Sequence, residues 1–222
     1  MLLKIGHRGA KTYEIENTLA GFKKAIELGA NAVELDLRIS ADGKLIISHD
    51  DNLKKVYGKD ILIKDATLSE LKELTEGRIA TLDEVLPAIK GTVEKVLVEL
   101  KEAGFEKKVL DLVEKEGMRD NVIILSFHED VLEQVRGLDR EIETGLVYAR
   151  YKGPIDAALR LNAQYLVPLY RFVHRRDVAK AHKSGLKVIV WTINSKDEAI
   201  LYKAKDVDGI ATDKPAILKG IV

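Results

Sequence analysis

Short apolar runs alternate along the chain with longer segments in which apolar residues recur about every 3.6 positions. The short runs are rich in Val, Ile and Leu, which is typical of strands that are buried on both faces of a parallel sheet. Eight runs predict strands, namely Leu2–Ile5, Ala32–Leu37, Lys95–Leu100, Val122–Leu125, Glu143–Val147, Tyr165–Val167, Lys187–Trp191 and Gly209–Ala211.

The longer segments between these runs predict helices. In Thr18–Leu28 the apolar residues fall largely on one side, and Gly29 then supplies a stop signal. Similar spacing predicts helices at Val109–Glu116, Glu129–Arg136, Ile155–Leu161, Arg175–Ser184 and Lys196–Ala204. About eight alternating strand–helix units imply a parallel sheet with right-handed crossovers and favour an α/β fold of the TIM (β/α)8 barrel type. A doubly wound open sheet is the alternative, but no G-x-G-x-x-G motif follows the first strand.

One segment departs from this alternation. The pair Asp42-Gly43 predicts a tight turn, after which Leu45–Ile47 returns as the second arm of a hairpin. Residues around 50–80 then form a short insertion before a helix at Leu82–Ile89. Loops that follow barrel strands build active sites, so we expect a single domain over residues 1–222 whose insertion contributes to function.

Two carboxylates fall within one apolar strand. Glu34 and Asp36 are two residues apart, so in a strand both side chains project to the same face, while Val33 and Leu35 are apolar. A barrel interior destabilises adjacent carboxylates unless a cation neutralises them. Hard cations prefer oxygen ligands, so the pair predicts one divalent cation, Mg²⁺ or Ca²⁺, with Mn²⁺ also acceptable. Salt bridges to lysines at the barrel rim are the alternative.

Two histidines follow predicted strands. His7 and Arg8 come after the first strand, and His49 comes at the end of the hairpin. The two imidazoles supply an acid and a base if both face one scissile bond, and the arginine is a planar donor for phosphate. A surface turn with polar residues is the alternative for the first pair. Asp50 either orients His49 or belongs to a turn, and we expect the turn.

A third carboxylate ends another predicted strand. Glu99 and Lys101 share one face of Lys95–Leu100 and its continuation. Glu99 would add a third oxygen ligand, and Lys101 a positive charge for a phosphate oxygen. An internal Glu–Lys ion pair is the alternative. Taken together, these groups are the equipment of metal-assisted phosphodiester cleavage.

Composition excludes several other classes of protein. The 222 residues hold 36 Lys and Arg against 36 Asp and Glu, and this balance does not favour nucleic acid as a partner. The chain has no cysteine, which excludes disulfides and thiolate metal sites. No uncharged apolar run is long enough to cross a bilayer, and the N-terminal apolar run is too short for a signal peptide, so we expect a cytoplasmic protein. The oligomeric state is left open.

The motifs occur in an order that resembles the glycerophosphodiester phosphodiesterase family across essentially the whole chain. They are His7-Arg8-Gly9, Glu16-Asn17-Thr18, Glu34-Leu35-Asp36, Asp42-Gly43, His49-Asp50, Glu99-Leu100-Lys101, Trp191-Thr192 and Thr212-Asp213-Lys214-Pro215. The sequence departs from the family pattern at Ile15, where proline is usual, and at Lys214, where arginine is usual.

The resemblance implies a TIM barrel that hydrolyses glycerophosphodiesters to glycerol 3-phosphate and an alcohol with a divalent cation. It implies an acid–base pair in His7 and His49. The implied metal ligands are Glu34, Asp36 and Glu99, and the implied substrate-binding residues are Arg8, Lys101 and Trp191. For Trp191, which would wall the glycerol pocket, core filling is the alternative.

The same residues allow three alternative functions. A lysophospholipase D acting on single-chain phospholipids would use the same chemistry with a different group beyond the phosphate. A Schiff-base aldolase would use Lys101 as its nucleophile. A phosphate-binding module without catalysis is disfavoured because every motif position needed for catalysis is filled.

Overall fold

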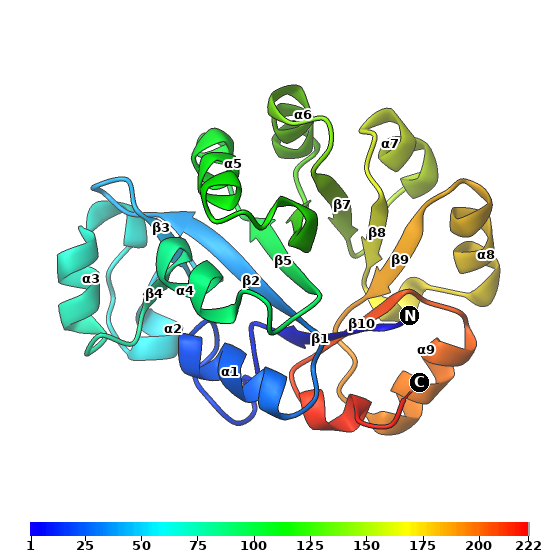
Figure 1. Ribbon diagram of the computed structural model, residues 1–222, viewed down its shortest axis with the longest axis horizontal. Coiled ribbons are helices and arrows are strands. Elements are labelled where there is room, and N and C mark those ends of the chain that lie inside the picture. The colour runs from blue at the N-terminus through cyan, green and yellow to red at the C-terminus, as the bar shows by residue number, and fades with distance from the viewer. Residues whose placement is uncertain (222) are drawn as a thin grey trace.

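Eight parallel strands close into a ring in the computed structural model, which describes residues 1–221 (Figure 1). Each strand pairs with the next, and β1 pairs with both β2 and β10, which closes the barrel. The predicted TIM barrel is confirmed. The barrel strands are β1 (Leu3–His7), β2 (Ala32–Ile39), β5 (Lys95–Leu100), β6 (Val122–Ser126), β7 (Glu143–Tyr148), β8 (Tyr165–Pro168), β9 (Lys187–Val190) and β10 (Gly209–Thr212).

Helices connect successive strands and surround the barrel (Figure 1). They are α1 (Leu19–Glu27), α4 (Leu82–Ile89), α5 (Glu106–Lys115), α6 (Glu129–Leu138), α7 (Pro154–Arg160), α8 (Arg175–Lys183) and α9 (Lys196–Ala204), with 3₁₀ turns η2 (Arg119–Asn121), η3 (Tyr170–Phe172) and η4 (Pro215–Leu218). The predicted bounds of the barrel strands and of these helices agree with the observed ones to within three residues. Several strands run one or two residues further than predicted, because polar residues such as His7 and Thr212 still pair with a neighbouring strand.

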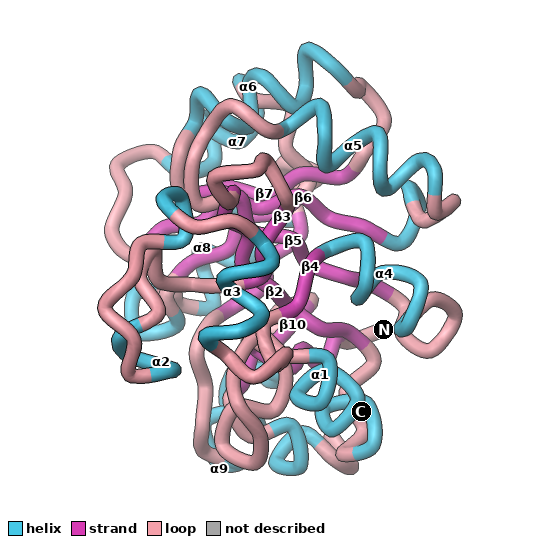
Figure 2. The backbone as a smooth tube through the Cα atoms, turned by 90° about the vertical axis from the view of Figure 1, so that its left-hand side faces the viewer, coloured by secondary structure: helices cyan, strands magenta, loops and turns pink. Residues whose placement is uncertain are grey.

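The insertion after β2 packs at one edge of the barrel and faces the viewer in Figure 2. It comprises β3 (Leu45–Ile47), α2 (Lys54–Tyr57), η1 (Ile63–Asp65), α3 (Leu68–Leu74) and β4 (Ala80–Thr81). The strand β3 runs antiparallel to β2, which confirms the predicted hairpin. Six buried apolar side chains give this segment a small core of its own: Ile46, Leu53, Ile63, Ala66, Leu71 and Ile79. The hairpin therefore holds the residues after β3 beside Asp36, in the middle of β2.

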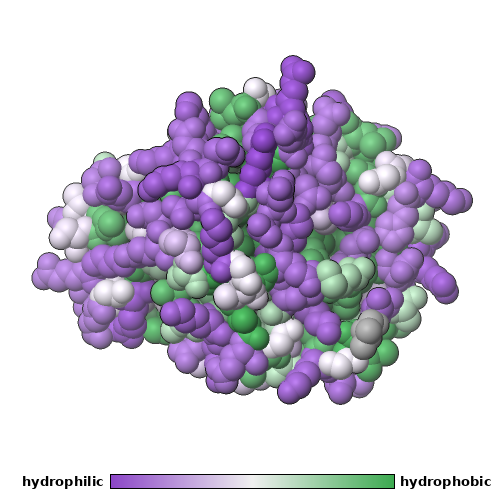
Figure 3. Space-filling model, in the orientation of Figure 1, coloured by the Kyte–Doolittle hydropathy of each residue, from purple (hydrophilic) through white to green (hydrophobic). Residues whose placement is uncertain are grey.

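The core has two layers. Inward-facing side chains, among them Ile5, Leu97 and Ile189, fill the barrel, and outward-facing ones pack against the helices. Figure 3 shows mostly hydrophilic residues on the visible face, with hydrophobic residues in smaller groups between them. Among residues 1–221, no helix has the length and apolar character needed to cross a membrane. Because apolar side chains fill the barrel interior, polar side chains gather at the barrel mouth, at the carboxyl ends of the strands.

Candidate active site

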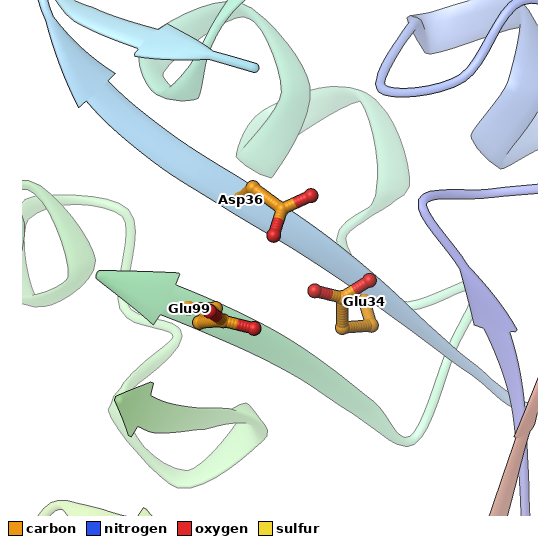
Figure 4. Close-up of side chains that lie close together, drawn as sticks. All are labelled: Glu34, Asp36 and Glu99. Atoms are coloured by element: carbon orange, nitrogen blue, oxygen red, sulfur yellow. The ribbon is translucent and has the colours of Figure 1, made fainter. Parts of the chain in front are cut away.

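Three buried carboxylates, two from the middle of β2 and one from the carboxyl end of β5, come together (Figure 4). Glu34 and Asp36 lie on β2, and the parallel register places Asp36 opposite Glu99 of β5. Their side chains turn toward one another, and one ligand atom from each lies within 4.8 Å of the others. The residues are only 5%, 1% and 7% exposed. The strand period thus brings together the three carboxylates that the sequence predicts as ligands.

This cluster has more negative charge than a buried site tolerates without compensation. Burial raises the pKa of Glu34 well above its ordinary value, and repulsion from Asp36 and Glu99 raises it further. Burial, with repulsion from Asp36, also raises the pKa of Glu99. The third carboxylate differs: burial acts to raise the pKa of Asp36, but Lys101 and Arg8 outweigh it and hold the pKa at about 2. A further cation at Glu34 and Glu99 would relieve this repulsion.

Two cationic side chains flank the cluster. The Lys101 ammonium lies 2.7 Å from Asp36 Oδ1 and also contacts Glu99 Oε1. The Arg8 guanidinium approaches Asp36 Oδ2 with its Nε at 3.3 Å and donates to Glu16 Oε1 at 2.9 Å. The ion pair that sequence offered as the alternative role of Lys101 is therefore present, and it lies inside the carboxylate cluster. Burial acts to lower the pKa of Lys101, but Asp36 and Glu99 outweigh it and raise the pKa, so the amine stays protonated. A protonated amine argues against the Schiff-base reading.

The loop after β1 is bent so that its backbone supports the site. Arg8 adopts a left-handed conformation, with φ at 53°, and its backbone N–H donates to Glu34 Oε2 at 2.9 Å. Gly9 follows at φ 85°, and a Cβ atom there would lie 2.6 Å from the backbone carbon of Gly21 in α1. Only glycine fits this approach, because the obstacle is backbone rather than a movable side chain. The His-Arg-Gly order therefore has a structural cause.

His7 is oriented by the far end of the chain. Its Nδ1 lies 2.7 Å from Asp213 Oδ1, just after β10, and Asp213 Oδ2 accepts from Asn194 Nδ2 at 2.8 Å. The other ring nitrogen, Nε2, lies 4.0 Å from Glu34 Oε2. Burial lowers the pKa of His7, while the hydrogen bond to Asp213 opposes this effect. A carboxylate at Nδ1 favours the tautomer in which Nε2 is free to exchange a proton in the cavity.

His49 has a carboxylate of its own. Its Nδ1 lies 2.6 Å from Asp50 Oδ1, and burial lowers the pKa of the imidazole. Arg38 donates from its side chain to the backbone oxygen of His49 at 3.0 Å, and Ser48 N donates to Asp36 O at 2.9 Å. These bonds tie the residues after β3 to β2. Asp50 lies in a bend, as expected for a turn residue, and it also contacts the His49 ring, as its alternative role requires.

One cavity collects the predicted site residues. It is lined by His7, Arg8, Glu34, His49, Glu99, Lys101 and Trp191, and Asp36 lies beneath it in contact with Lys101. All eight are thus brought together. The rest of the lining forms an apolar wall that includes Phe127, whose ring meets that of Trp191 edge to face at 5.8 Å. The Trp191 indole donates to Val167 O at 2.8 Å, so its plane is fixed against the barrel.

Sequence reasoning missed three supporting residues. Asn17, 3% exposed, donates to Asp36 Oδ2 at 2.8 Å from a left-handed conformation with φ at 57°. Asp213 and Asn194 form the support behind His7. A signal for Asp213 was available, because it lies two residues after the predicted strand Gly209–Ala211, as His7 does after Leu2–Ile5. Nothing in the chain before folding links it to His7, 206 residues away.

Comparison with known proteins gives a consistent result. The family model described as the glycerophosphoryl diester phosphodiesterase family matches residues 7–217. A glycerophosphodiester phosphodiesterase of Caldanaerobacter subterraneus is 34% identical over 236 residues, which cover 99% of this chain and 97% of that protein.

Two solved structures extend the comparison. The crystal structure of a glycerophosphodiester phosphodiesterase from Thermotoga maritima matches with a TM-score of 0.87 at 33% identity, over 100% of this chain and 99% of that one. A phosphodiesterase from Oleispira antarctica, in complex with the product sn-glycerol-3-phosphate, matches with a TM-score of 0.88 at 27% identity, over 96% of this chain and 93% of that one. On the sequence match, the barrel and the polar cluster at its mouth, the chain belongs to the glycerophosphoryl diester phosphodiesterase family and is a phosphoric diester hydrolase.

Proposed function

We propose that this protein hydrolyses glycerophosphodiesters to glycerol 3-phosphate and an alcohol, with a divalent cation and a pair of histidines. The observation that carries the proposal is the meeting of three carboxylates, two cations and two carboxylate-bound imidazoles at one cavity. Residues 1–222 would act as one catalytic domain, in which the insertion serves to place His49. The product bound to the Oleispira antarctica phosphodiesterase supports this substrate class.

Glu34, Asp36 and Glu99 would hold the cation. The donor set fits a hard divalent ion, because three buried carboxylates within 4.8 Å carry one more negative charge than Arg8 and Lys101 neutralise. The raised pKa values of Glu34 and Glu99 indicate the same shortage of positive charge. Mg²⁺ and Ca²⁺ suit this chemistry, and Mn²⁺ is acceptable. When bound, the cation would supply neutralisation of charge on the phosphoryl oxygens.

His7 and His49 would move the protons. Each holds its Nδ1 against a carboxylate, which leaves Nε2 as the working atom in the cavity. One imidazole takes the proton of a glycerol hydroxyl, whose oxygen forms a bond to phosphorus while the bond to the departing alkoxide breaks. The other imidazole protonates that alkoxide. Water then opens the cyclic phosphate with the proton roles reversed, and each step gains about 10²–10⁴-fold from such transfer.

Arg8 and Lys101 would bind the phosphate oxygens. Both are held at the cavity by carboxylates, so their charge is positioned before substrate arrives. Trp191 would form the wall against the glycerol carbons, because its indole N–H is already satisfied by Val167 O and its ring lines the cavity. Substrate specificity beyond the phosphate would then depend on the apolar wall.

Turnover of glycerophosphocholine, followed as release of glycerol 3-phosphate, tests the proposal. We expect loss of turnover on chelation, recovery with Mg²⁺, Ca²⁺ or Mn²⁺, and a fall of at least about 10²-fold in His7→Ala and in His49→Ala. His182→Ala is the matched control, because His182 also pairs with an aspartate, Asp208, at 2.9 Å but lies in α8 outside the cavity. Full turnover after chelation, or in either cavity variant, would refute the mechanism.

A lysophospholipase D activity is the second candidate. The observation that favours it is the apolar wall of the cavity, where Phe127 is 41% exposed beside Trp191. An exposed aromatic ring at the mouth suits a single acyl chain. Comparing kcat/KM for glycerophosphocholine and for lysophosphatidylcholine distinguishes the two activities, and a strong preference for the lipid would replace the first proposal with the second.

A further inference from the structure

A second hollow lies on the outside of the barrel, between α7 and α8, which are neighbours in Figure 1. It has a volume of about 590 Å³, which is in the range of ligand-sized sites. Its floor is apolar and includes Ile155, Leu166 and Val178. Its lining carries three cations, Arg150, Arg176 and Lys180, against one carboxylate, Asp177. An apolar floor with a net cationic lining is complementary to an amphipathic anion rather than to a neutral apolar ligand.

Two loops form the upper edge of this hollow. Residues 149–153 follow β7 and residues 169–176 follow β8, so both lie at the barrel end that carries the active site. Together they hold five cations and no carboxylate, although the whole chain is balanced at 36 of each. The five cations are Arg150, Lys152, Arg171, Arg175 and Arg176. Of these five cations, only Arg176 has a carboxylate of residues 1–221 within 4.0 Å, that of Asp177 at 3.7 Å.

Each loop places an exposed aromatic ring among its cations. Tyr151 is 38% exposed between Arg150 and Lys152, and Phe172 is 41% exposed after Arg171. The Arg150 guanidinium lies over the Phe172 ring, 4.7 Å from its centre, so the two loops meet. Aromatic rings interleaved with arginine and lysine are characteristic of surfaces that rest at the boundary between lipid headgroups and acyl chains.

These loops adjoin the mouth of the catalytic cavity. Tyr170 donates its backbone N–H to Trp191 O at 2.9 Å, and Leu169 forms a bridge with Trp191, which lines that cavity. A surface pressed against residues 149–153 and 169–176 would therefore lie beside the cavity entrance. Such docking would place the entrance near amphipathic phosphodiesters held in that surface.

We propose that residues 149–153 and 169–176 form a docking surface for an anionic lipid bilayer. The cations would lie against the headgroup phosphates, and Tyr151 and Phe172 would enter the interfacial layer. Attraction to an anionic leaflet is about fivefold in partition for each cation near the surface, and it weakens as salt rises. The inference is separate from the proposed hydrolysis, because vesicle binding is measured without turnover.

Co-sedimentation with vesicles of equimolar phosphatidylcholine and phosphatidylglycerol tests the proposal. We expect binding that is weaker on pure phosphatidylcholine and at raised ionic strength. The triple variant Arg150→Ala/Lys152→Ala/Arg171→Ala should partition roughly a hundredfold less. Its matched control removes three cations at the opposite end of the barrel, where the helices end: Lys115→Ala/Arg140→Ala/Lys183→Ala.

The outcomes separate cleanly. The control should bind vesicles like the unmodified protein, and both triple variants should keep glycerophosphocholine turnover, which shows that they are folded. Equal losses of vesicle binding in the two triple variants would mean that binding depends only on the net charge of the protein, and this result would overturn the proposal. Absence of binding by the unmodified protein, or binding of a single-stranded oligonucleotide in place of vesicles, would also overturn it. The aromatic variant Tyr151→Ala/Phe172→Ala should keep salt-sensitive binding and lose the part that survives high salt.

Discussion

Asp213→Asn is the substitution that examines the support of His7 most directly. The two oxygens of Asp213 both accept: Oδ1 lies 2.7 Å from His7 Nδ1, and Oδ2 accepts from Asn194 Nδ2 at 2.8 Å. An asparagine has only one oxygen, so its amide must face one of these partners. If the asparagine NH2 group faces Asn194 Nδ2, two N–H donors oppose each other. If it faces His7 Nδ1, it favours the tautomer with the proton on Nε2, and this nitrogen can then no longer act as a base.

The size of the effect follows from the same contacts. Burial acts to raise the pKa of Asp213, but the hydrogen bond and charge of His7, with Asn194 and Lys11, outweigh it and hold the pKa at about 2. A fall from the ordinary 3.8 to about 2 is equivalent to roughly 2 kcal/mol of interaction with the carboxylate. When His7 takes up a proton, its share of this interaction strengthens, so loss of the carboxylate costs up to about 30-fold in kcat. The wrong tautomer adds to this, and we expect about 10²–10³-fold in total.

Steady-state kinetics on glycerophosphocholine, with the Mg²⁺ affinity measured separately by calorimetry, checks this expectation. The loss should fall on kcat with little change in KM or in Mg²⁺ affinity, because the contacts of Asp213 are with His7, Asn194 and Lys11 and not with the carboxylate cluster, Arg8 or Lys101. Asp208→Asn is the matched control. Asp208 accepts from His182 Nε2 at 2.9 Å and from Val188 N at 2.7 Å, yet lies outside the cavity.

Two results would refute the reasoning. A kcat within about threefold of the unmodified enzyme would mean that the tautomer of His7 does not matter to the reaction. Equal losses in the Asp208 and Asp213 variants would mean that the effect is general destabilisation. A circular dichroism melt of both variants establishes that the fold is retained.

Three further predictions concern stability. Gly9→Ala should lower the free energy of unfolding in urea by more than about 2 kcal/mol, because the new Cβ would lie 2.6 Å from the Gly21 backbone. Gly29→Ala, at φ 96° with open space around it, should lower it by only about 1 kcal/mol. Equal losses in the two variants would contradict the packing argument. Because the pKa of Asp213 is lower in the folded state, the stabilisation that it contributes is present above about pH 3.8 and is lost as the pH falls toward 2. Asp213→Asn should therefore lose less stability than the unmodified protein over that range. Parallel curves of unfolding free energy against pH for the two proteins would contradict this expectation. Glu34→Gln should raise the melting temperature of the metal-free protein by about 2–4 °C, because it removes the repulsion from Asp36 and Glu99. The same variant should abolish turnover. A lower melting temperature would show that the Glu34 carboxylate stabilises the metal-free protein.

The sequence by itself determined the fold and much of the site. Alternating apolar runs and helical segments identified all eight barrel strands, because a strand buried on both faces has a composition that no turn or surface helix shares. The two-residue spacing of Glu34 and Asp36 placed both on one face without any knowledge of neighbours. The motif series then brought His7, His49 and Lys101 into the same expectation.

Only the tertiary structure decided which groups support these residues. Closing the ring by pairing β10 with β1 brings Asp213 beside His7, and no local pattern encodes a contact across 206 residues. The register of β2 and β5 decided that Lys101 enters the carboxylate cluster. Likewise, the net charge of zero concealed a basic surface, because a sum over the chain is blind to which loops meet in space. Local periodicity is a property of the chain, whereas pairing and charge clustering depend on through-space distances that exist only after folding.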